Sequence, residues 1–243
     1  MSRKVPSSVI ATALAAGVLL TTATAASGAP VSTVPISMAH AAAVPGGPVI
    51  LVHGWTGSSA GMAVMRDAFA AAGYPTFTID LPGQNNVTNA HAIANFVHTV
   101  KHQTSATRVH LVTHSMGGLS ARYYLKRLGG VGEVSTFVSM GAPQYGSLPA
   151  CLLSERDGGQ MCPFSGFLRD LNTGDDTPGE VGYFTFRSTK DTADVTRLDG
   201  GACFHEISGV EHADEPRSPQ FIQAALAAVS GSCPGSFVNL PVE

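Results

Sequence analysis

The chain contains few charged residues. Only 13% of its 243 residues are Asp, Glu, Lys or Arg, and its 14 basic and 17 acidic side chains give a net charge of −3 with histidine neutral. No run of lysine or arginine occurs along the sequence, so it has no basic patch of the kind that binds nucleic acid. We therefore expect no nucleic-acid partner.

Long apolar runs are also missing after the first 25 residues, whereas a helix that crosses a bilayer needs about 20 apolar residues. Before that point, Arg3 and Lys4 precede an apolar stretch at 9–20 and the small residues Ala23-Thr24-Ala25. This order is typical of a secretory signal peptide, which we predict at 1–25 with cleavage after Ala25. A second small-residue site at 39–41 allows cleavage as late as 41. We expect a secreted, extracellular protein without a stable membrane anchor.

Cysteine is scarce, and no Cys-x-x-Cys spacing of the kind that binds zinc occurs. An even set of four cysteines in an oxidising compartment predicts disulfides. Proximity in the sequence favours Cys151 with Cys162 and Cys203 with Cys233. We expect no metal site.

Apolar, β-branched segments alternate with helical ones after an Ala-, Pro- and Ser-rich leader at 26–47. This alternation predicts an α/β fold, with a mostly parallel sheet of about six strands and helices on both faces. The predicted strands are Val49–His53, Pro75–Ile79, Arg108–Thr113, Val134–Met140, Tyr183–Ser188 and Cys203–Ser208. The predicted helices are Ala60–Ala72, Asn89–Gln103, Met116–Leu128 and Pro219–Val229, with a shorter helical piece at Ser165–Leu171.

A candidate nucleophile follows the third predicted strand, where the sequence reads Thr113-His114-Ser115-Met116-Gly117-Gly118. Small residues after a buried strand allow a tight turn into a helix, which leaves the Ser115 hydroxyl exposed at the sheet edge. The usual pattern for such a turn is Gly-x-Ser-x-Gly. Thr113 replaces its first glycine.

A serine nucleophile needs a histidine base and an acid that orients it, and in this kind of fold they follow the serine in the order acid, histidine. His212 lies in a loop after the last predicted strand and is the preferred base, whereas His205 lies within that strand. Asp191 follows the preceding strand by one turn and is the preferred acid. Asp194, three residues further on, is the alternative.

The first predicted strand runs into His53-Gly54-Trp55-Thr56-Gly57, where glycines free the backbone to direct N–H groups at a site. We predict that the backbone N–H groups of Trp55 and Met116 form an oxyanion hole. The alternative for Trp55 is an aromatic side chain of the core.

The segment at 142–182 breaks the alternation of strands and helices. It is long and punctuated by glycine and proline, and it leaves the carboxyl end of a strand, where ligands bind in open α/β sheets. We interpret it as a flap on the substrate side.

In their order along the chain, these motifs resemble the small secreted bacterial lipases and esterases of the α/β-hydrolase fold, of the minimal type that lacks the first two antiparallel strands. They are Val52-His53-Gly54-Trp55, the Ser115 turn, Gly141-Ala142-Pro143, residues 186–191 ending in Asp191, and Gly209-Val210-Glu211-His212. The resemblance implies a single catalytic domain at 48–243 that hydrolyses carboxylic esters, acylglycerols above all, without a cofactor. It assigns Ser115, Asp191 and His212 as the triad and Trp55 and Met116 as the oxyanion donors.

The expected partner is an ester or lipid substrate, bound at a lipid–water interface by a monomeric protein. The same triad also serves short-chain carboxylesterases, polymer esterases and acyltransferases, so these remain alternatives. A catalytically silent hydrolase-fold binding protein is the alternative outside enzymes. It has no need of a serine, an acid and a histidine in sequence order.

Overall fold

The computed structural model describes residues 46–191 and 197–238. The predicted signal peptide and nearly all of the leader lie outside these residues, so their boundaries stay predictions. None of the described helices is both long and apolar enough to cross a membrane.

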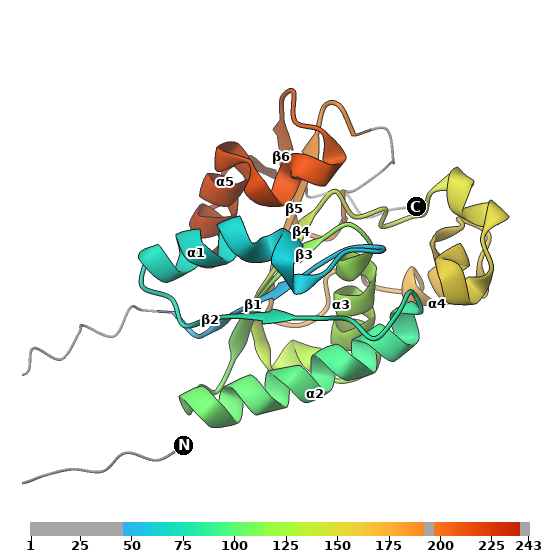
Figure 1. The fold of residues 1–243 in the computed structure, drawn as a ribbon. Helices are drawn as coiled ribbons and strands as arrows, with labels where there is room; N and C mark the ends of the chain where they lie inside the picture. Colours follow the sequence, from blue (N-terminus) through green and yellow to red (C-terminus); the bar gives the residue numbers. More distant parts are fainter. Residues whose placement is uncertain (1–45, 192–196, 239–243) are drawn as a thin grey trace, which may run out of the picture. The chain divides into compact units, whose positions relative to one another are not determined.

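Seven strands form one sheet in the order β2-β1-β3-β4-β5-β6-β7. Strands β1 to β6 are labelled in Figure 1. The first six strands are parallel, which confirms the predicted mostly parallel sheet. A seventh strand of two residues pairs antiparallel with β6 and is too short to leave a pattern in the sequence. The strands are β1 (Val49–Val52), β2 (Thr76–Ile79), β3 (Val109–His114), β4 (Val134–Met140), β5 (Gly182–Ser188), β6 (Cys203–Ile207) and β7 (Ser236–Phe237).

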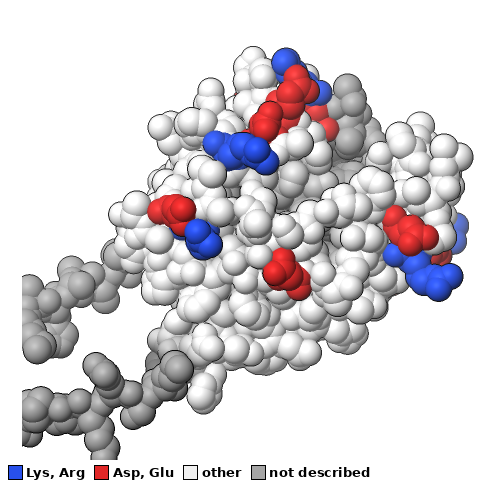
Figure 2. All heavy atoms as spheres, viewed as in Figure 1, with Lys and Arg blue, Asp and Glu red and all other residues white. Residues whose placement is uncertain are grey.

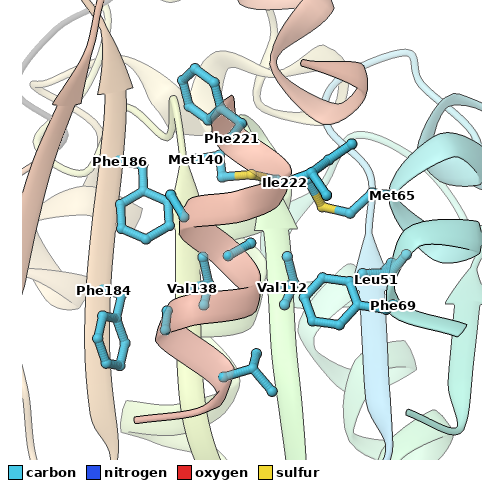
Figure 3. Packing of buried hydrophobic residues seen from close by; sticks show 14 of the residues in the cluster. Leu51, Met65, Phe69, Val112, Val138, Met140, Phe184, Phe186, Phe221 and Ile222 are labelled. Carbon is cyan, nitrogen blue, oxygen red and sulfur yellow. The ribbon is translucent and has the colours of Figure 1, made fainter. Parts of the chain in front are cut away.

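Helices cover both faces of the sheet, as alternating strands and helices predict. On one face, α1 (Ala63–Ala71) and α5 (Pro219–Val229) pack on the strands: Phe69 of α1 lies beside Leu51 and Val112, and Phe221 of α5 lies beside Met140 (Figure 3). On the other face lie α2 (Asn86–Thr104) and α3 (Met116–Arg127), whose apolar side chains pack with the alternate residues of the same strands. Both faces of the central strands are therefore buried, which explains why β1 is a continuous apolar run.

The sheet reverses its direction of growth between β1 and β3. The chain goes from β1 to β2 at one edge, then crosses back through α2 to place β3 on the other side of β1. The loops that follow β1 and β3 therefore leave in opposite directions and open a crevice at the carboxyl edge of the sheet. This topology brings the Gly54 loop and Ser115 to the same point.

The predicted flap contains three short 3₁₀ helices and one α-helix. These are η3 (Leu148–Leu152), η4 (Glu155–Asp157), η5 (Gly159–Met161) and α4 (Gly166–Leu171). A disulfide joins Cys151 to Cys162 within it, and a second joins Cys203 of β6 to Cys233 after α5. Both predicted pairings are confirmed.

A buried ion cluster fastens the flap to α3. The guanidinium of Arg122, fully buried on α3, donates to the carboxylate of Asp176 and to Asn172 Oδ1 at 2.8 Å. Lys126 Nζ lies 3.3 Å from the same carboxylate, and the Tyr145 hydroxyl donates to it at 2.5 Å. Two buried cations therefore depend on one flap carboxylate for compensation.

We expect Asp176→Asn to lower the free energy of unfolding by about 3 to 5 kcal/mol, because it leaves two buried cations without their counter-charge. Unfolding in guanidinium chloride, followed by the fluorescence of the single tryptophan, measures this free energy. Asp170→Asn is the matched control, since Asp170 is exposed and pairs with Arg127 at the surface. It should cost no more than about 1 kcal/mol. An equal loss of unfolding free energy in the two variants would contradict a stabilising role for the buried ion cluster.

Candidate active site

Ser115 lies at the sharp turn between β3 and α3. Its φ of +54° and ψ of −132° are rarely adopted by residues with a side chain. The turn also brings backbones together: a Cβ on Gly117 would lie 2.3 Å from the His53 carbonyl oxygen, and one on Gly118 would lie 2.6 Å from Ala142 Cβ. Both glycines are therefore required by packing at this turn.

Thr113 occupies the position where the usual motif has its first glycine. Its side chain is buried, and Oγ1 donates a hydrogen bond to the Val138 carbonyl oxygen at 2.9 Å. Room for it exists because Gly118 has no side chain, since a Cβ there would lie 3.3 Å from Thr113 Oγ1. The departure from the motif is thus accommodated against β4 without loss of the Ser115 turn.

The loop after β1 lies directly against the serine. A Cβ on Gly54 would lie 2.6 Å from Ser115 Cβ and 3.2 Å from its Oγ. The next amide belongs to Trp55, while Met116 provides the first amide of α3, where helix N–H groups have no partner within the helix. Gly54 and Ser115 lie in close contact, and the two amides predicted as oxyanion donors belong to the residues that follow them, Trp55 and Met116.

The imidazole of His212 links Ser115 to Asp191. Nε2 lies 2.9 Å from Ser115 Oγ, and Nδ1 lies 3.1 Å from Asp191 Oδ2. Asp191 is buried after β5, and His212 begins the 3₁₀ helix η6 (His212–Arg217) after β6. Because β3, β5 and β6 are parallel, their carboxyl ends share one edge, and three residues distant in sequence form a hydrogen-bonded row.

The surroundings of His212 set its protonation. Burial lowers the pKa of the imidazole, but the hydrogen bond and charge of Asp191 and the charge of Glu215 outweigh burial and raise the pKa above its usual value of about 6.5. The imidazole is neutral, and able to accept the Ser115 proton, only above that raised pKa.

His205, the alternative base, does not join this row. His205 lies within β6, where its ring meets Phe186 edge-on at 6.1 Å. Asp194 lies outside the described residues. The side chain of Trp55 is 43% exposed, so it is no core aromatic, and its indole N–H donates to the Asp157 carbonyl oxygen of the flap at 2.8 Å.

Two further side chains beside the row of Ser115, His212 and Asp191 had no role in the sequence analysis. Glu215 Oε2 lies 3.7 Å from His212 Nδ1 and 3.4 Å from His114 Nε2, and the three ligand atoms lie within 4.8 Å of one another. The imidazole nitrogens of this group already have hydrogen-bond partners, namely Asp191 for His212 and the His212 carbonyl oxygen for His114. A cation held by this group would displace both bonds. The one sequence signal for Glu215 is its spacing of three residues from His212.

Comparisons with known proteins agree with this architecture. A family model for the alpha/beta hydrolase fold matches residues 47–160. The chain has the α/β-hydrolase fold. Among solved structures it is similar to Aspergillus fumigatus lipase B, at 18% identity and a TM-score of 0.63, covering 79% of this chain and 54% of that one. It is also similar to the propeptide form of Bacillus licheniformis lipase BlEst2, at 20% identity and a TM-score of 0.66, covering 82% and 52%.

This chain spans about half the length of those two lipases. A pyrethroid hydrolase from Sphingobium faniae JZ-2 is matched over 97% of its length, with 76% of this chain, 13% identity and a TM-score of 0.53. At these identities the likeness shows the fold alone.

In this protein, two cavities meet at Ser115 and His212, and Trp55 lines both. One, of about 270 Å³, faces the flap and is lined by apolar side chains including Pro143, Pro149, Ala150, Leu153 and Met161. The other, of about 300 Å³, is more polar, with His53, Thr56, Ser58, His114 and Arg217 in its wall. Groups of different polarity can therefore bind on the two sides of the serine.

We expect Ser115 to react covalently with a fluorophosphonate, at a rate that rises with pH through the raised pKa of His212, because only the neutral imidazole removes the hydroxyl proton. Mass spectrometry of the labelled protein across pH 5 to 9 measures this rate. His212→Ala should slow labelling about 10²- to 10⁴-fold. His205→Ala is the matched control and should label like the wild type. The opposite result for the two histidines would contradict the assignment.

Proposed function

We propose that this protein is a secreted serine hydrolase that cleaves carboxylic esters, with Ser115, His212 and Asp191 as its triad. The observation that carries the proposal is the hydrogen-bonded row from Ser115 Oγ through the imidazole to the Asp191 carboxylate. It supplies a nucleophile, a base and a group that orients the base, which together constitute nucleophilic catalysis.

In the proposed reaction, His212 Nε2 removes the Ser115 proton as Oγ attacks the ester carbonyl carbon. Asp191 keeps the proton on Nδ1 and stabilises the imidazolium that forms. The imidazolium then protonates the leaving alcohol as the carbon–oxygen bond breaks, which leaves an acyl-enzyme. Water, deprotonated by the same imidazole, releases the carboxylic acid and restores Ser115.

We assign the backbone N–H groups of Trp55 and Met116 as the hydrogen-bond donors that stabilise the negative charge developing on the carbonyl oxygen. The contact of Gly54 with Ser115 supports this assignment, because it brings the Trp55 loop to the serine. The loss of one such donor typically costs about 3 to 4 kcal/mol of transition-state stabilisation. The chemistry uses only protein groups and water.

The two cavities support a division of the substrate between them. The apolar cavity under the flap suits an acyl chain, and the more polar one suits the alcohol portion. Trp55, which lines both, then separates acyl from alcohol next to the oxyanion.

A triacylglycerol lipase is the form of this activity that the surface favours. The flap, which lines the apolar cavity, exposes Leu148, Leu152 and Phe164 by 65%, 92% and 72%. Apolar side chains that gather at a surface are typical of a site that contacts a partner or a membrane. Figure 2 shows few charged side chains on the face viewed, in small groups separated by wide uncharged areas. Such a surface suits contact with a lipid–water interface. Two of the similar structures are themselves called lipases.

We expect the wild-type protein to hydrolyse p-nitrophenyl esters of several acyl lengths and emulsified triglyceride, and Ser115→Ala to hydrolyse neither, because the attacking oxygen is gone. Release of p-nitrophenol and of titratable acid measures the two reactions. Equal background from both proteins would overturn the proposed hydrolase. A rate that peaks at short acyl chains and vanishes on the emulsion would identify a carboxylesterase instead.

We also propose that the protein is exported with cleavage after Ala25, a location that suits its two disulfides. When a bacterial host expresses the full chain, we expect protein in the medium whose N-terminal residue is Ala26, as Edman sequencing or mass spectrometry would reveal. An N-terminus at Ala42 would move the cleavage to the second site. Uncleaved protein confined to the cytoplasm would contradict export.

A further inference from the structure

The carboxyl group of Glu215 lies beside His212 but has no part in the proposed triad. The residue is fully buried, and no donor among the described residues makes a hydrogen bond to either of its oxygens. A buried carboxylate without such bonds is costly unless a cation forms beside it. The nearby groups that can become cationic are the imidazoles of His114 and His212.

The local fold places Glu215 beneath His212. The helix that begins at His212 is a 3₁₀ helix, with three residues per turn, so side chains three positions apart lie one above the other. Glu215 Oε2 thereby comes to 3.7 Å from Nδ1 of His212, on the side where Asp191 also lies.

Gly141 at the end of β4 leaves the space for this arrangement. A Cβ at Gly141 would lie 2.3 Å from Glu215 Oε2 and 2.8 Å from His212 Nδ1. The backbone there has a φ of +55°, which further favours glycine. The gap that holds the carboxylate against the imidazole is therefore part of the fold.

Four groups face the His212 ring: Ser115 Oγ at Nε2, Asp191 and Glu215 at Nδ1, and the His114 ring, whose centroid is 4.6 Å away. The other charges on neighbouring elements pair with each other at the surface, as Lys190 with Glu211 and Arg217 with Asp214. The positive charge that the reaction creates on His212 thus meets two buried carboxylates.

We infer that Glu215 is a second carboxylate that positions His212 and stabilises its imidazolium, together with Asp191. The inference rests on the proposed function. Glu215 does not touch the reacting atoms and acts through His212, so it is a positioning residue. His114 Nε2 hydrogen-bonds to the His212 carbonyl oxygen at 3.0 Å and fixes the backbone of the same residue from the other side.

The test compares Glu215→Gln with Asp214→Asn across pH 5 to 9 on a soluble p-nitrophenyl ester. Both variants remove one negative charge from the same 3₁₀ helix, but Asp214 is exposed and pairs with Arg217. For Glu215→Gln we expect kcat to fall about tenfold with KM within about twofold, and the acid limb of kcat/KM to move to lower pH, because the imidazolium loses a neighbouring anion. Asp214→Asn should match the wild type.

An NMR titration of His212 in the same proteins needs no substrate, and Glu215→Gln should lower the imidazole pKa while Asp214→Asn leaves it unchanged. An unmoved acid limb and an unmoved imidazole pKa in Glu215→Gln would overturn the inference, even if kcat fell, because they would indicate a purely structural role. Hydrolysis lost in Ser115→Ala but unaffected by Glu215→Gln would keep the proposed function and reject the second carboxylate. A wild type without hydrolysis would reject the function, while the titration would still decide the coupling.

If Glu215→Gln fails to fold, Asp191→Asn provides the second test, because Glu215 is then the remaining carboxylate at Nδ1. We expect the His212 pKa to fall in that variant, and to fall further in the double variant Asp191→Asn/Glu215→Asp, whose shorter side chain withdraws the remaining carboxylate from Nδ1. An equal His212 pKa in these two proteins would show that Glu215 does not support the imidazole, and would overturn the inference.

Discussion

The strained turn at Ser115 is the constraint on which the rest of the site depends. A positive φ on a residue with a side chain is unfavourable, and it persists because Gly117 packs on the backbone of the loop after β1 and Gly118 on β4. The same contacts bring Gly54 against the serine. The conformation of Ser115 and the proximity of the loop after β1, which carries the predicted oxyanion donor Trp55, therefore follow from the same close packing.

Two carboxylates surround the imidazole of His212. Asp191 and Glu215 approach the same ring nitrogen from different elements, one after β5 and one in the helix that His212 itself begins. Both raise the pKa of an imidazole that burial would otherwise lower. In the proposed ester cleavage, an imidazole with a raised pKa retains the proton that it takes from Ser115, which stabilises the charged state through which the reaction passes.

The flap is held in place by contacts that are separate from those around Ser115. It exposes Leu148, Leu152 and Phe164, but it also buries apolar side chains such as Met161 and Phe167 in one cluster with Leu119 of α3. It is fixed by a disulfide within it, by the indole of Trp55 bonded to Asp157, and by the buried pair of Arg122 and Asp176. The flap can thus present an apolar surface next to the serine while remaining attached to the helix behind the nucleophile.

The sequence by itself determined the alternation of strands and helices, the turn at Ser115 and the serial order of serine, acid and histidine, because these depend on local periodicity and on glycines next to buried strands. It also favoured both disulfides by proximity, and the structure contains them. Only the tertiary structure decided that His212 rather than His205 meets Ser115, that Asp191 reaches the imidazole, that Glu215 is buried beside two imidazoles, and that Asp176 is buried beside two cations. Those contacts join residues from separate strands and loops, and their distances depend on how parallel strands align at one edge, which no local pattern encodes.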